Sequence, residues 1–505
     1  MQWLRSRSDK LNPMVKFVDP AFVCASVAMA ATCDGLSSLN LPYTTVTLAQ
    51  KRPAGGFTPP GGAPAQAPRN LPAFCRVTAI LKPSADSDIR IEVWMPASGW
   101  NGRLVAVGNG GWSGAINYGG MAQMLSRGYA TASTDTGHEG GGAEFAMGHR
   151  EKLIDFAYRS EHELTLKAKA IIAAFYGNAA QRSYWFGCSS GGKQGLMEAQ
   201  RYPRDYDGII AGAPANYWTH LMFGDMWPGE VTLTDPAHHL GQEKFALVHK
   251  AALAACDALD GVSDGVLEDP TRCHFDPGSL ACKGADGPDC LTQPEVEAAR
   301  KIYQGPVNPR THQQIFPGLE PGSELGWRFL AGGPKPFAIV DSYFRYVLFE
   351  NPDWDFRTLN FDKDVAEADK LDAKLLNATD PNLKDFVSHG GKLFLYHGWN
   401  DQLIAPQNTV NYYNSVVKKM GPKVNDSVRL FMVPGMNHCG GGDGPFRFDQ
   451  VSGLDEWVEK GAAPDRVIAS HPSGRTRPLC PYPQVAKYKG SGPTDDAANF
   501  VCSAP

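Results

Sequence analysis

The sequence lacks several features that would point to common classes of binding protein. Its 48 Lys and Arg against 53 Asp and Glu give a formal net charge of -5, and no long basic run is present. A chain without a basic patch has little electrostatic attraction for nucleic acid or for an anionic membrane surface. Beyond its first residues, the sequence also has no stretch of the roughly 18 apolar residues that a membrane span needs. We therefore expect neither nucleic acid nor a membrane as a partner.

The composition also excludes a disordered or fibrous protein. The chain has 505 residues, of which 43% are hydrophobic, so it can bury a large core. Its 54 glycines and 38 prolines are spread along the chain and form no repeat. This distribution indicates many turns on a compact body.

The first residues resemble a secretory signal peptide. Four basic residues precede a short apolar stretch over residues 22–31, which ends in small side chains. A basic start, an apolar middle and a small-residue cleavage site define such peptides. We expect residues 1–31 to be a signal peptide cut near Ala30, with Met14 as an alternative start, and the mature protein to be secreted or periplasmic.

The cysteine content supports export. Cys24 lies in the expected leader, so ten of the eleven cysteines remain, and ten can pair completely. They lack the C-x-x-C spacing of zinc sites, and disulfides are typical of oxidising compartments, whereas buried free thiols in a cytosolic protein are the alternative. The expected disulfide cysteines are Cys33, Cys75, Cys188 and Cys439, together with the close couples Cys256/Cys273, Cys282/Cys290 and Cys480/Cys502.

Short β-rich runs alternate with amphipathic helical stretches in two parts of the chain, which predicts a parallel α/β sheet. The predicted strands span residues 89–94, 103–107, 129–133, 183–186, 208–212, 392–396 and 428–433. The predicted helices lie near residues 154–176, 193–201, 409–419 and 451–460. Between these parts, residues 215–385 are rich in Trp, Pro, Gly and Asp and show little β alternation. We predict one catalytic α/β domain, residues 32–214 and 386–505, interrupted by a lid domain, residues 215–385.

Residues 187–191, GCSSG, match the G-x-S-x-G nucleophile elbow. In this elbow small flanking residues allow a strained turn between a strand and a helix, and the turn exposes the serine. A second match at residues 261–265 lies in an Asp-rich loop with no preceding strand, whereas the first follows a predicted strand and opens a predicted helix. We predict Ser189 as the nucleophile, with Ser190 and Cys188 as local alternatives.

A serine hydroxyl needs a histidine base that is oriented by a carboxylate, and in α/β hydrolases these residues follow the serine in the order Asp, His. Asp401 comes just after the predicted strand 392–396, and His438 just after the strand 428–433. Such sheets assemble their sites in loops at the carboxyl ends of strands. We therefore predict Asp401 and His438 as the other triad members. The alternatives are His389, His397 and Asp135.

The oxyanion of acyl transfer needs two backbone N–H donors. One comes from the residue after the nucleophile, here Ser190, and the other from an early glycine-rich loop. The loop 108–111 follows a predicted strand directly, so Gly110 or Gly111 is the expected second donor, and a plain tight turn is the alternative. Cys188 and Cys439 adjoin the predicted nucleophile and base, and a bond between them is possible only if the triad forms.

Residues 257–266 concentrate acidic side chains among glycine turns, as Ca²⁺ loops do, although the loop lacks the glutamate that ends an EF-hand. Asp257, Asp260 and Asp264 would provide carboxylate oxygens, and Val262 and Val266 would provide backbone carbonyls. We expect a structural Ca²⁺ in the lid, remote from the triad. A solvated acidic turn is the alternative.

At these residues the chain resembles the tannase and feruloyl esterase family, which also contains a hydrolase of mono(2-hydroxyethyl) terephthalate. The likeness covers nearly the whole mature chain and rests on residues 187–192, residues 202–208 (YPRDYDG), the His438–Cys439 pair and the Asp-rich loop. It implies an α/β-hydrolase fold with a large inserted lid. It also implies a Cys188–Cys439 bond, one Ca²⁺ in the lid and no organic cofactor.

The resemblance implies a serine carboxylic ester hydrolase that acts on a small aromatic ester, a gallate, hydroxycinnamate or related ester, through an acyl-enzyme. Phe344 and Arg345 of the aromatic-rich lid are candidate substrate-binding residues, Arg345 as a ligand for a carboxylate. The terephthalate hydrolase has a glutamate where this chain has Ser190. The alternatives are a terephthalate monoester hydrolase and an inactive, calcium-stabilised binding protein on a hydrolase scaffold.

Overall fold

The computed structural model describes residues 30–60 and 68–505. The expected signal peptide therefore lies, except for its last two residues, outside the described residues. The first described residues are anchored to the body, because Ala31 N–H donates to Ala174 O at 2.8 Å.

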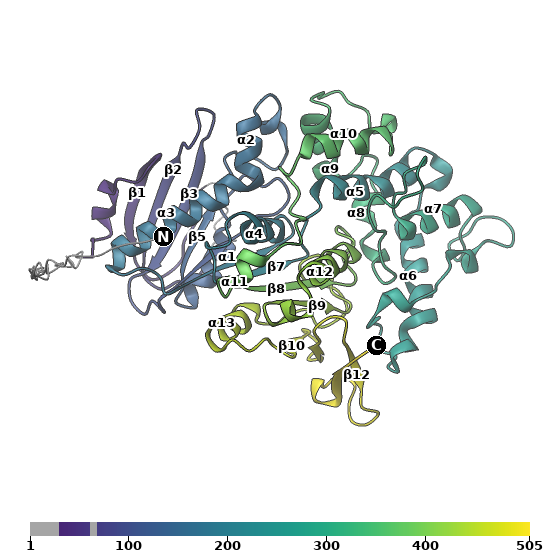
Figure 1. Cartoon of the computed structure of the whole chain (residues 1–505). Helices are drawn as coiled ribbons and strands as arrows, with labels where there is room; N and C mark the ends of the chain where they lie inside the picture. The colour runs from purple at the N-terminus through teal and green to yellow at the C-terminus, as the bar shows by residue number, and fades with distance from the viewer. Residues whose placement is uncertain (1–29, 61–67) are drawn as a thin grey trace, which may run out of the picture.

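A nine-stranded sheet forms the centre of the molecule, with strands in the order β1-β2-β3-β5-β4-β6-β7-β8-β9 (Figure 1). The strands are β1 Thr44–Arg52, β2 Phe74–Leu81, β3 Ile89–Pro96, β4 Arg103–Val107, β5 Ala130–Thr134, β6 Arg182–Cys188, β7 Gly208–Gly212, β8 Lys392–Gly398 and β9 Val428–Val433. All seven predicted strands are present. β4 and β7 are apolar and buried almost throughout, as parallel strands covered on both faces are.

The prediction of a parallel sheet is confirmed from β5 through β4 to β9 and is wrong at the other edge. There β1, β2, β3 and β5 pair antiparallel, and β1 and β2 were not predicted. The reason is chain length, because the link from Leu81 to Ile89 is too short for a parallel crossover, which takes about a dozen residues.

Helices cover both faces of the sheet. Side chains of α3 Ser160–Tyr176, α4 Ser190–Arg201 and α12 Gln407–Met420 pack on one face, and those of α1 Tyr118–Ser126 and α13 Gln450–Lys460 on the other. The helix predicted near residues 154–176 is α3, preceded by a π-helical turn over Asp155–Arg159 and the short helix α2 Arg150–Ile154.

Between β7 and β8 the chain leaves the sheet and forms mainly helices and loops. We call residues 215–385 the inserted segment. Its helices are α5 Trp218–Leu233, α6 Gln242–Cys256, α7 Gln293–Gln304, α8 Arg328–Ala331, α9 Ala338–Tyr343 and α10 Lys363–Asp372, and α11 Lys384–Ser388 leads back to the sheet. These helices gather on one side of the sheet (Figure 1).

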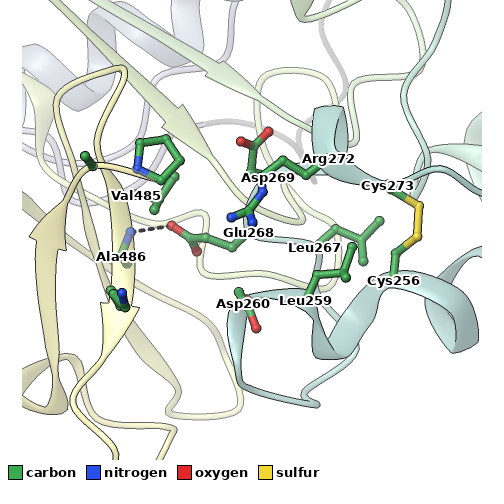
Figure 2. A pocket seen from close by; sticks show the side chains of 13 residues that line it. Cys256, Leu259, Asp260, Leu267, Glu268, Asp269, Arg272, Cys273, Val485 and Ala486 are labelled. Carbon is green, nitrogen blue, oxygen red and sulfur yellow. Dashed lines mark hydrogen bonds between the residues drawn. A yellow bond between two sulfur atoms is a disulfide. The ribbon is translucent and has the colours of Figure 1, made fainter.

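The chain ends in two small two-stranded sheets, which lie beside the inserted segment (Figure 2). Their strands are β10 Val467–Ser470 with β11 Thr476–Leu479, and β12 Val485–Tyr488 with β13 Phe500–Ser503. Glu268 of the inserted segment accepts a hydrogen bond of 2.6 Å from the backbone N–H of Ala486 in β12. The C-terminal strands are thereby attached to the inserted segment.

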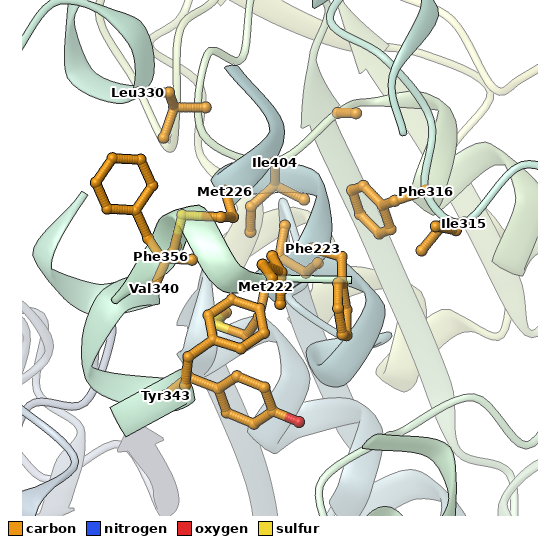
Figure 3. Close-up of a cluster of buried hydrophobic side chains, with 14 of the residues drawn as sticks. Met222, Phe223, Met226, Ile315, Phe316, Leu330, Val340, Tyr343, Phe356 and Ile404 are labelled. Carbon is orange, nitrogen blue, oxygen red and sulfur yellow. The ribbon is translucent and has the colours of Figure 1, made fainter. Parts of the chain in front are cut away.

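The inserted segment forms a hydrophobic core that also includes buried side chains from residues 112–157 and 404–405 (Figure 3). Met222, Phe223 and Met226 of α5 lie among side chains from the following loops and helices, and α5 is apolar nearly all round. Ile404, which comes from the loop after β8, belongs to the same core and is 3% exposed. The inserted segment therefore packs directly on the loop that carries Asp401.

The expected cysteine pairing is confirmed by five disulfides. They join Cys33–Cys75, Cys188–Cys439, Cys256–Cys273, Cys282–Cys290 and Cys480–Cys502. Among the described residues, no helix is both long enough and apolar enough to cross a lipid bilayer.

Candidate active site

Ser189 occupies a sharp turn between β6 and α4. Its φ of 63° and ψ of -125° lie in a region that residues with a side chain rarely adopt, so the turn is strained. Glycine is required on both sides, since a Cβ on Gly187 would overlap the Gly191 carbonyl and a Cβ on Gly191 would lie 2.9 Å from Asn109 O. The backbone holds the turn in place, because Ser189 N–H donates to Gly212 O at 3.0 Å. This geometry is that of a nucleophile elbow.

His438 and Asp401 meet at the carboxyl ends of β9 and β8. His438 Nδ1 lies 2.8 Å from Asp401 Oδ2, and the His438 N–H donates to Gln402 Oε1 at 3.2 Å. Burial lowers the pKa of His438, but the charge of Asp401 and the hydrogen bond to it raise that pKa more, so the net shift is upward. Nε2 makes no hydrogen bond within the described part of the chain, so it is the nitrogen that can exchange a proton with a substrate or a nucleophile.

Asp401 is fully buried and is bound from several sides. Besides His438, it accepts hydrogen bonds of 2.9 Å from the backbone N–H groups of Leu403 and Ile404 and contacts His397 Nε2 at 3.0 Å. Burial raises the pKa of Asp401, but His438 and His397 lower it more, so the carboxyl is held well below its usual range. A carboxylate in this state can orient a histidine and balance its positive charge.

His397 was an alternative to His438 and has a different position. It is fully buried, its Nδ1 lies 2.7 Å from Thr409 Oγ1, and its Nε2 faces both Asp401 Oδ2 and Ile404 O at 3.0 Å. Both ring nitrogens are thus engaged, and His397 supports Asp401. This supporting role was not predicted, although the spacing of four residues from His397, at the end of a strand, to Asp401 in the following loop is a usable signal.

The Cys188–Cys439 disulfide joins the residue before Ser189 to the residue after His438. Its Cα atoms are 6.0 Å apart, and it connects positions 251 residues apart in sequence. Because each cysteine is the direct neighbour of a predicted triad residue, the bond keeps the serine turn and the histidine loop side by side.

The glycine-rich loop after β4 lies against the start of α4. Gly191 N–H donates to Asn109 O at 2.8 Å, and Ser190 Oγ donates to Gly111 O at 2.9 Å. The backbone N–H groups of Gly110, Gly111 and Ser190 donate to no described residue. These groups are therefore free to donate to an oxyanion beside Ser189.

The remaining alternatives lie elsewhere. Asp135 accepts hydrogen bonds of 2.9 Å from the backbone N–H groups of Arg90 and Gly137, and burial raises its pKa to about 7. His389 is exposed at the end of α11. Ser263, the serine of the second G-x-S-x-G match, is exposed in a loop that follows no strand.

The inserted segment contacts the glycine-rich loop directly. Trp112 Nε1 donates to Ile339 O at 2.9 Å, and a Cβ on Gly111 would lie 2.8 Å from Ile339 Cδ1. Phe344, a candidate substrate residue, is fully buried and pairs with aromatic rings of the inserted segment. Arg345 Nε donates to Asp341 Oδ2 at 2.6 Å, so its guanidinium serves a local ion pair.

The Asp-rich loop, residues 257–266, lies at a junction. Asp264 forms ion pairs with Arg475 and Arg477 of the C-terminal region. Val266 Cγ1 lies 3.0 Å from the place that a Cβ on Gly435 would occupy, three residues before His438. One end of the loop therefore contacts the segment that leads to the histidine.

The chemistry of this loop fits a hard cation. Burial raises the pKa of Asp260 to about 6, and the charges of Asp264 and Asp257 add to the rise. Asp257 Oδ1 accepts from the backbone N–H groups of Asp264 and Gly265 at 3.3 and 3.2 Å, which wraps the loop around its carboxylate. The carboxylate oxygens of Asp257, Asp260 and Asp264 do not all lie within 4.8 Å of one another. These residues nevertheless supply carboxylate oxygens of the kind that Ca²⁺ binds, although Arg475 and Arg477 already offset part of their charge.

The fold and the Ser189 elbow define the class of protein, an α/β hydrolase. Residues 75–503 match the model of the family described as tannase and feruloyl esterase. The chain belongs to this family, as its sequence predicts.

Similar proteins come from bacteria and fungi. An uncharacterized esterase of Xanthomonas campestris pv. campestris is 37% identical, over 94% of this chain and 92% of its own length. A probable feruloyl esterase B-2 of Aspergillus oryzae is 31% identical, over 97% of this chain and its full length. The crystal structure of feruloyl esterase B from Aspergillus oryzae superposes with a TM-score of 0.87 at 29% identity, covering 93% of this chain and 99% of that one.

Proposed function

We propose that the protein is a secreted serine esterase that cleaves aromatic carboxylic esters, with Ser189, His438 and Asp401 as its triad. The observation that carries this proposal is the hydrogen bond of 2.8 Å between His438 and Asp401, in a loop that a disulfide ties to the strained Ser189 turn. The inserted segment serves as the lid over this site.

In the proposed reaction, Ser189 Oγ attacks the ester carbonyl carbon while His438 Nε2 takes the hydroxyl proton. The carbonyl oxygen becomes an oxyanion and accepts hydrogen bonds from the N–H groups of Ser190 and of Gly110 or Gly111. His438 then gives its proton to the leaving alkoxide, and an acyl-enzyme remains. Water then attacks the acyl-enzyme while His438 takes its proton. The bond between the acyl carbon and Ser189 Oγ breaks, His438 returns the proton to Oγ, and the acid is released.

An aromatic acyl group is supported by the family and by its relatives. The family model names tannase and feruloyl esterase, and two of the similar proteins are feruloyl esterases by name. A hydroxycinnamate or gallate ester is therefore the first class of substrate to test.

The proposal includes export and a bound Ca²⁺. Five disulfides are typical of proteins that fold in an oxidising compartment. Asp257, Asp260 and Asp264, with the carbonyls of Val262 and Val266, would hold the ion. When bound, it would neutralise the loop and stabilise the contact with the histidine loop.

The test is hydrolysis of methyl ferulate, methyl gallate and mono(2-hydroxyethyl) terephthalate by the oxidised protein, by Ser189→Ala and by Ser263→Ala. Ser263 is the matched control, because it is the serine of the second motif and is exposed. We expect turnover of ferulate or gallate by the wild type and Ser263→Ala and loss of turnover in Ser189→Ala.

Other outcomes select other functions. Turnover of the terephthalate ester alone would assign the protein to that specificity, which Ser190 argues against because its hydroxyl donates to Gly111 O. If no ester is cleaved and a fluorophosphonate leaves Ser189 unlabelled, the protein is an inactive binding protein. Activity that survives in Ser189→Ala would contradict the proposed nucleophile.

A further inference from the structure

A second cluster of ionisable side chains lies at the opposite end of α4 from Ser189. Glu198 is in the last turn of α4, His162 is on α3, and Asp205 is in the loop between α4 and β7. One ligand atom of each residue lies within 4.8 Å of those of the other two. Helix α3, helix α4 and the loop before β7 thus bring one imidazole nitrogen and two carboxylates together.

Glu198 carries the main evidence that this cluster has a ligand. The residue is 1% exposed, and both of its carboxylate oxygens are buried without a hydrogen-bond partner among the described residues. Burying a carboxylate without a hydrogen bond or a cation is strongly unfavourable. The side chain therefore needs either a bound cation or a proton to offset its burial.

The other two residues are already oriented. His162 Nδ1 lies 2.6 Å from Asp205 Oδ2, and the imidazole stacks on Tyr202 with ring centroids 3.8 Å apart. The backbone N–H of Asp205 donates to Tyr202 O at 2.9 Å. Tyr202, which lies outside the cluster, thus holds the His162 ring by stacking and the Asp205 backbone by a hydrogen bond, as outer contacts orient the ligands of a metal site.

Neighbouring charges compensate Glu198 only in part, because the ammonium of Lys169 opposes the effect of its burial and of the nearby carboxylates. The ammonium of Lys169 on α3 donates to the backbone carbonyl of Asp205 and not to a cluster carboxylate. Glu161 on α3 is a further buried carboxyl group, which Lys193 compensates in part and which accepts from Gln194 at 2.6 Å. The two carboxylates of the cluster thus face the single ammonium of Lys169, and this balance favours a cation over an anion as the ligand.

We propose that His162, Glu198 and Asp205 bind one divalent transition-metal ion, with Zn²⁺ as the expected species. An imidazole nitrogen with two carboxylates is a donor set that suits Zn²⁺, whereas Ca²⁺ takes oxygen ligands only. Bonds of about 2.1 Å from one ion can bridge the observed spacing after small side-chain adjustments. The site lies away from the ester chemistry, and the ion would fasten the nucleophile helix α4 to α3 and to the loop before β7.

The competing arrangement contains no metal. In it Glu198 keeps a proton and shares it with the facing Asp205, since burial first and the neighbouring carboxylates next raise the pKa of Glu198 well above its usual range. The two arrangements differ in a directly measurable way, because only the first binds a metal with defined stoichiometry.

The experiment is calorimetric titration of the full, oxidised protein with ZnCl₂, after chelation and in saturating Ca²⁺ so that the Asp-rich loop stays filled. We expect one Zn²⁺ per chain in the wild type and at least about 100-fold weaker binding in Glu198→Gln and in His162→Gln. His149→Gln is the matched control, because His149 also contacts an aspartate, Asp86, at 3.1 Å but on the surface. It should bind Zn²⁺ like the wild type.

A second readout protects the test against misfolding of the buried variant. Co²⁺ in place of Zn²⁺ should give visible d–d absorption in the wild type, and none in His162→Gln, whose side chain is partly exposed and whose fold is checked by circular dichroism. The proposal is overturned if the folded wild type binds no stoichiometric Zn²⁺, or if both variants bind it unchanged. Either result would mean that a proton shared with Asp205, and not a metal ion, offsets the burial of Glu198.

Discussion

At the scale of single residues, the arrangement around Asp401 determines what His438 can do. One oxygen, Oδ2, faces both His438 Nδ1 and His397 Nε2, at 2.8 and 3.0 Å. The other oxygen, Oδ1, is occupied by two backbone N–H groups. The carboxylate therefore cannot rotate away from His438 without losing several hydrogen bonds, and its charge is available to stabilise a protonated His438.

Replacing Asp401 by Asn should strongly reduce catalysis. The amide would present an N–H₂ group or a neutral oxygen to His438, so the imidazole would lose its orientation and its counter-charge. We expect kcat/KM to fall by about 10⁴-fold, the scale known for loss of a triad carboxylate. Asp135→Asn is the control, because an asparagine oxygen still accepts from the Arg90 N–H, and its kcat/KM should stay within a few-fold of the wild type.

The pH profile offers a separate prediction. Asp401 raises the pKa of His438 above its ordinary value of about 6.5, and only the neutral imidazole can accept the serine proton. We therefore expect kcat/KM to fall as pH drops through a midpoint above about 6.5. In Asp401→Asn the raising charge is gone while burial remains, so the residual activity should have its midpoint at lower pH. A midpoint that Asp401→Asn leaves unmoved would show that another group limits the rate.

The sequence identified Ser189, Asp401 and His438 as candidates because each follows a strand in the expected order. The order Ser, Asp, His favours His438, which follows Asp401, over His397, which precedes it, but the sequence does not show what His397 does. Only the hydrogen bonds show that both nitrogens of His397 are in use. Phe344 and Arg345 were chosen because the lid is rich in aromatic residues, but aromatic density in a sequence does not distinguish a core position from a pocket wall.

At the scale of elements, the active site is assembled by joining two loops that do not pair through the sheet. β6, which leads into Ser189, and β9, which leads into His438, are separated in the sheet by β7 and β8. The Cys188–Cys439 bond spans this gap. The disulfide therefore helps to fix the distance between Ser189 and His438, the proposed nucleophile and base.

Removing this bond should lower kcat of the folded enzyme in addition to lowering its stability. In Cys188→Ser/Cys439→Ser we expect a lower Tm, from a loss of up to about 5 kcal/mol of stability in the chain-entropy account, and a drop in kcat of about 100-fold from misplacement of His438. The control is Cys282→Ser/Cys290→Ser, which opens a loop of 8 residues away from the site. It should lower Tm by less and leave kcat unchanged. Equal kcat in both variants would limit the Cys188–Cys439 bond to a stabilising role.

The elements themselves could be predicted to different degrees. The central strands were found because strands buried on both faces are short apolar runs. β1 was missed because its residues are half-buried or exposed, with several polar side chains, and carry no such signal. α5 was missed because it is apolar nearly all round and contains Pro228, so it shows no helical periodicity.

At the scale of the whole molecule, the Asp-rich loop connects parts that are distant in sequence. It belongs to the inserted segment, its Asp264 pairs with arginines near the C-terminus, and its Val266 touches the histidine loop. Two residues further on, Glu268 binds the backbone of β12. The loop is thus a junction between the inserted segment, the C-terminal strands and the catalytic core.

Removal of Ca²⁺ should loosen this junction and lower both stability and activity. At a roughly 100-fold excess over Kd, a bound ion adds about 2.7 kcal/mol, which corresponds to about 3 °C in Tm for a chain of this size. We expect EGTA to lower Tm by this amount in the wild type and re-added Ca²⁺ to restore it, measured by differential scanning calorimetry. Asp260→Asn should respond to neither treatment. Asp276→Asn, which changes an exposed carboxylate of the inserted segment paired with Arg300, should respond like the wild type. A Tm that EGTA does not move would show instead that the loop is a solvated acidic turn.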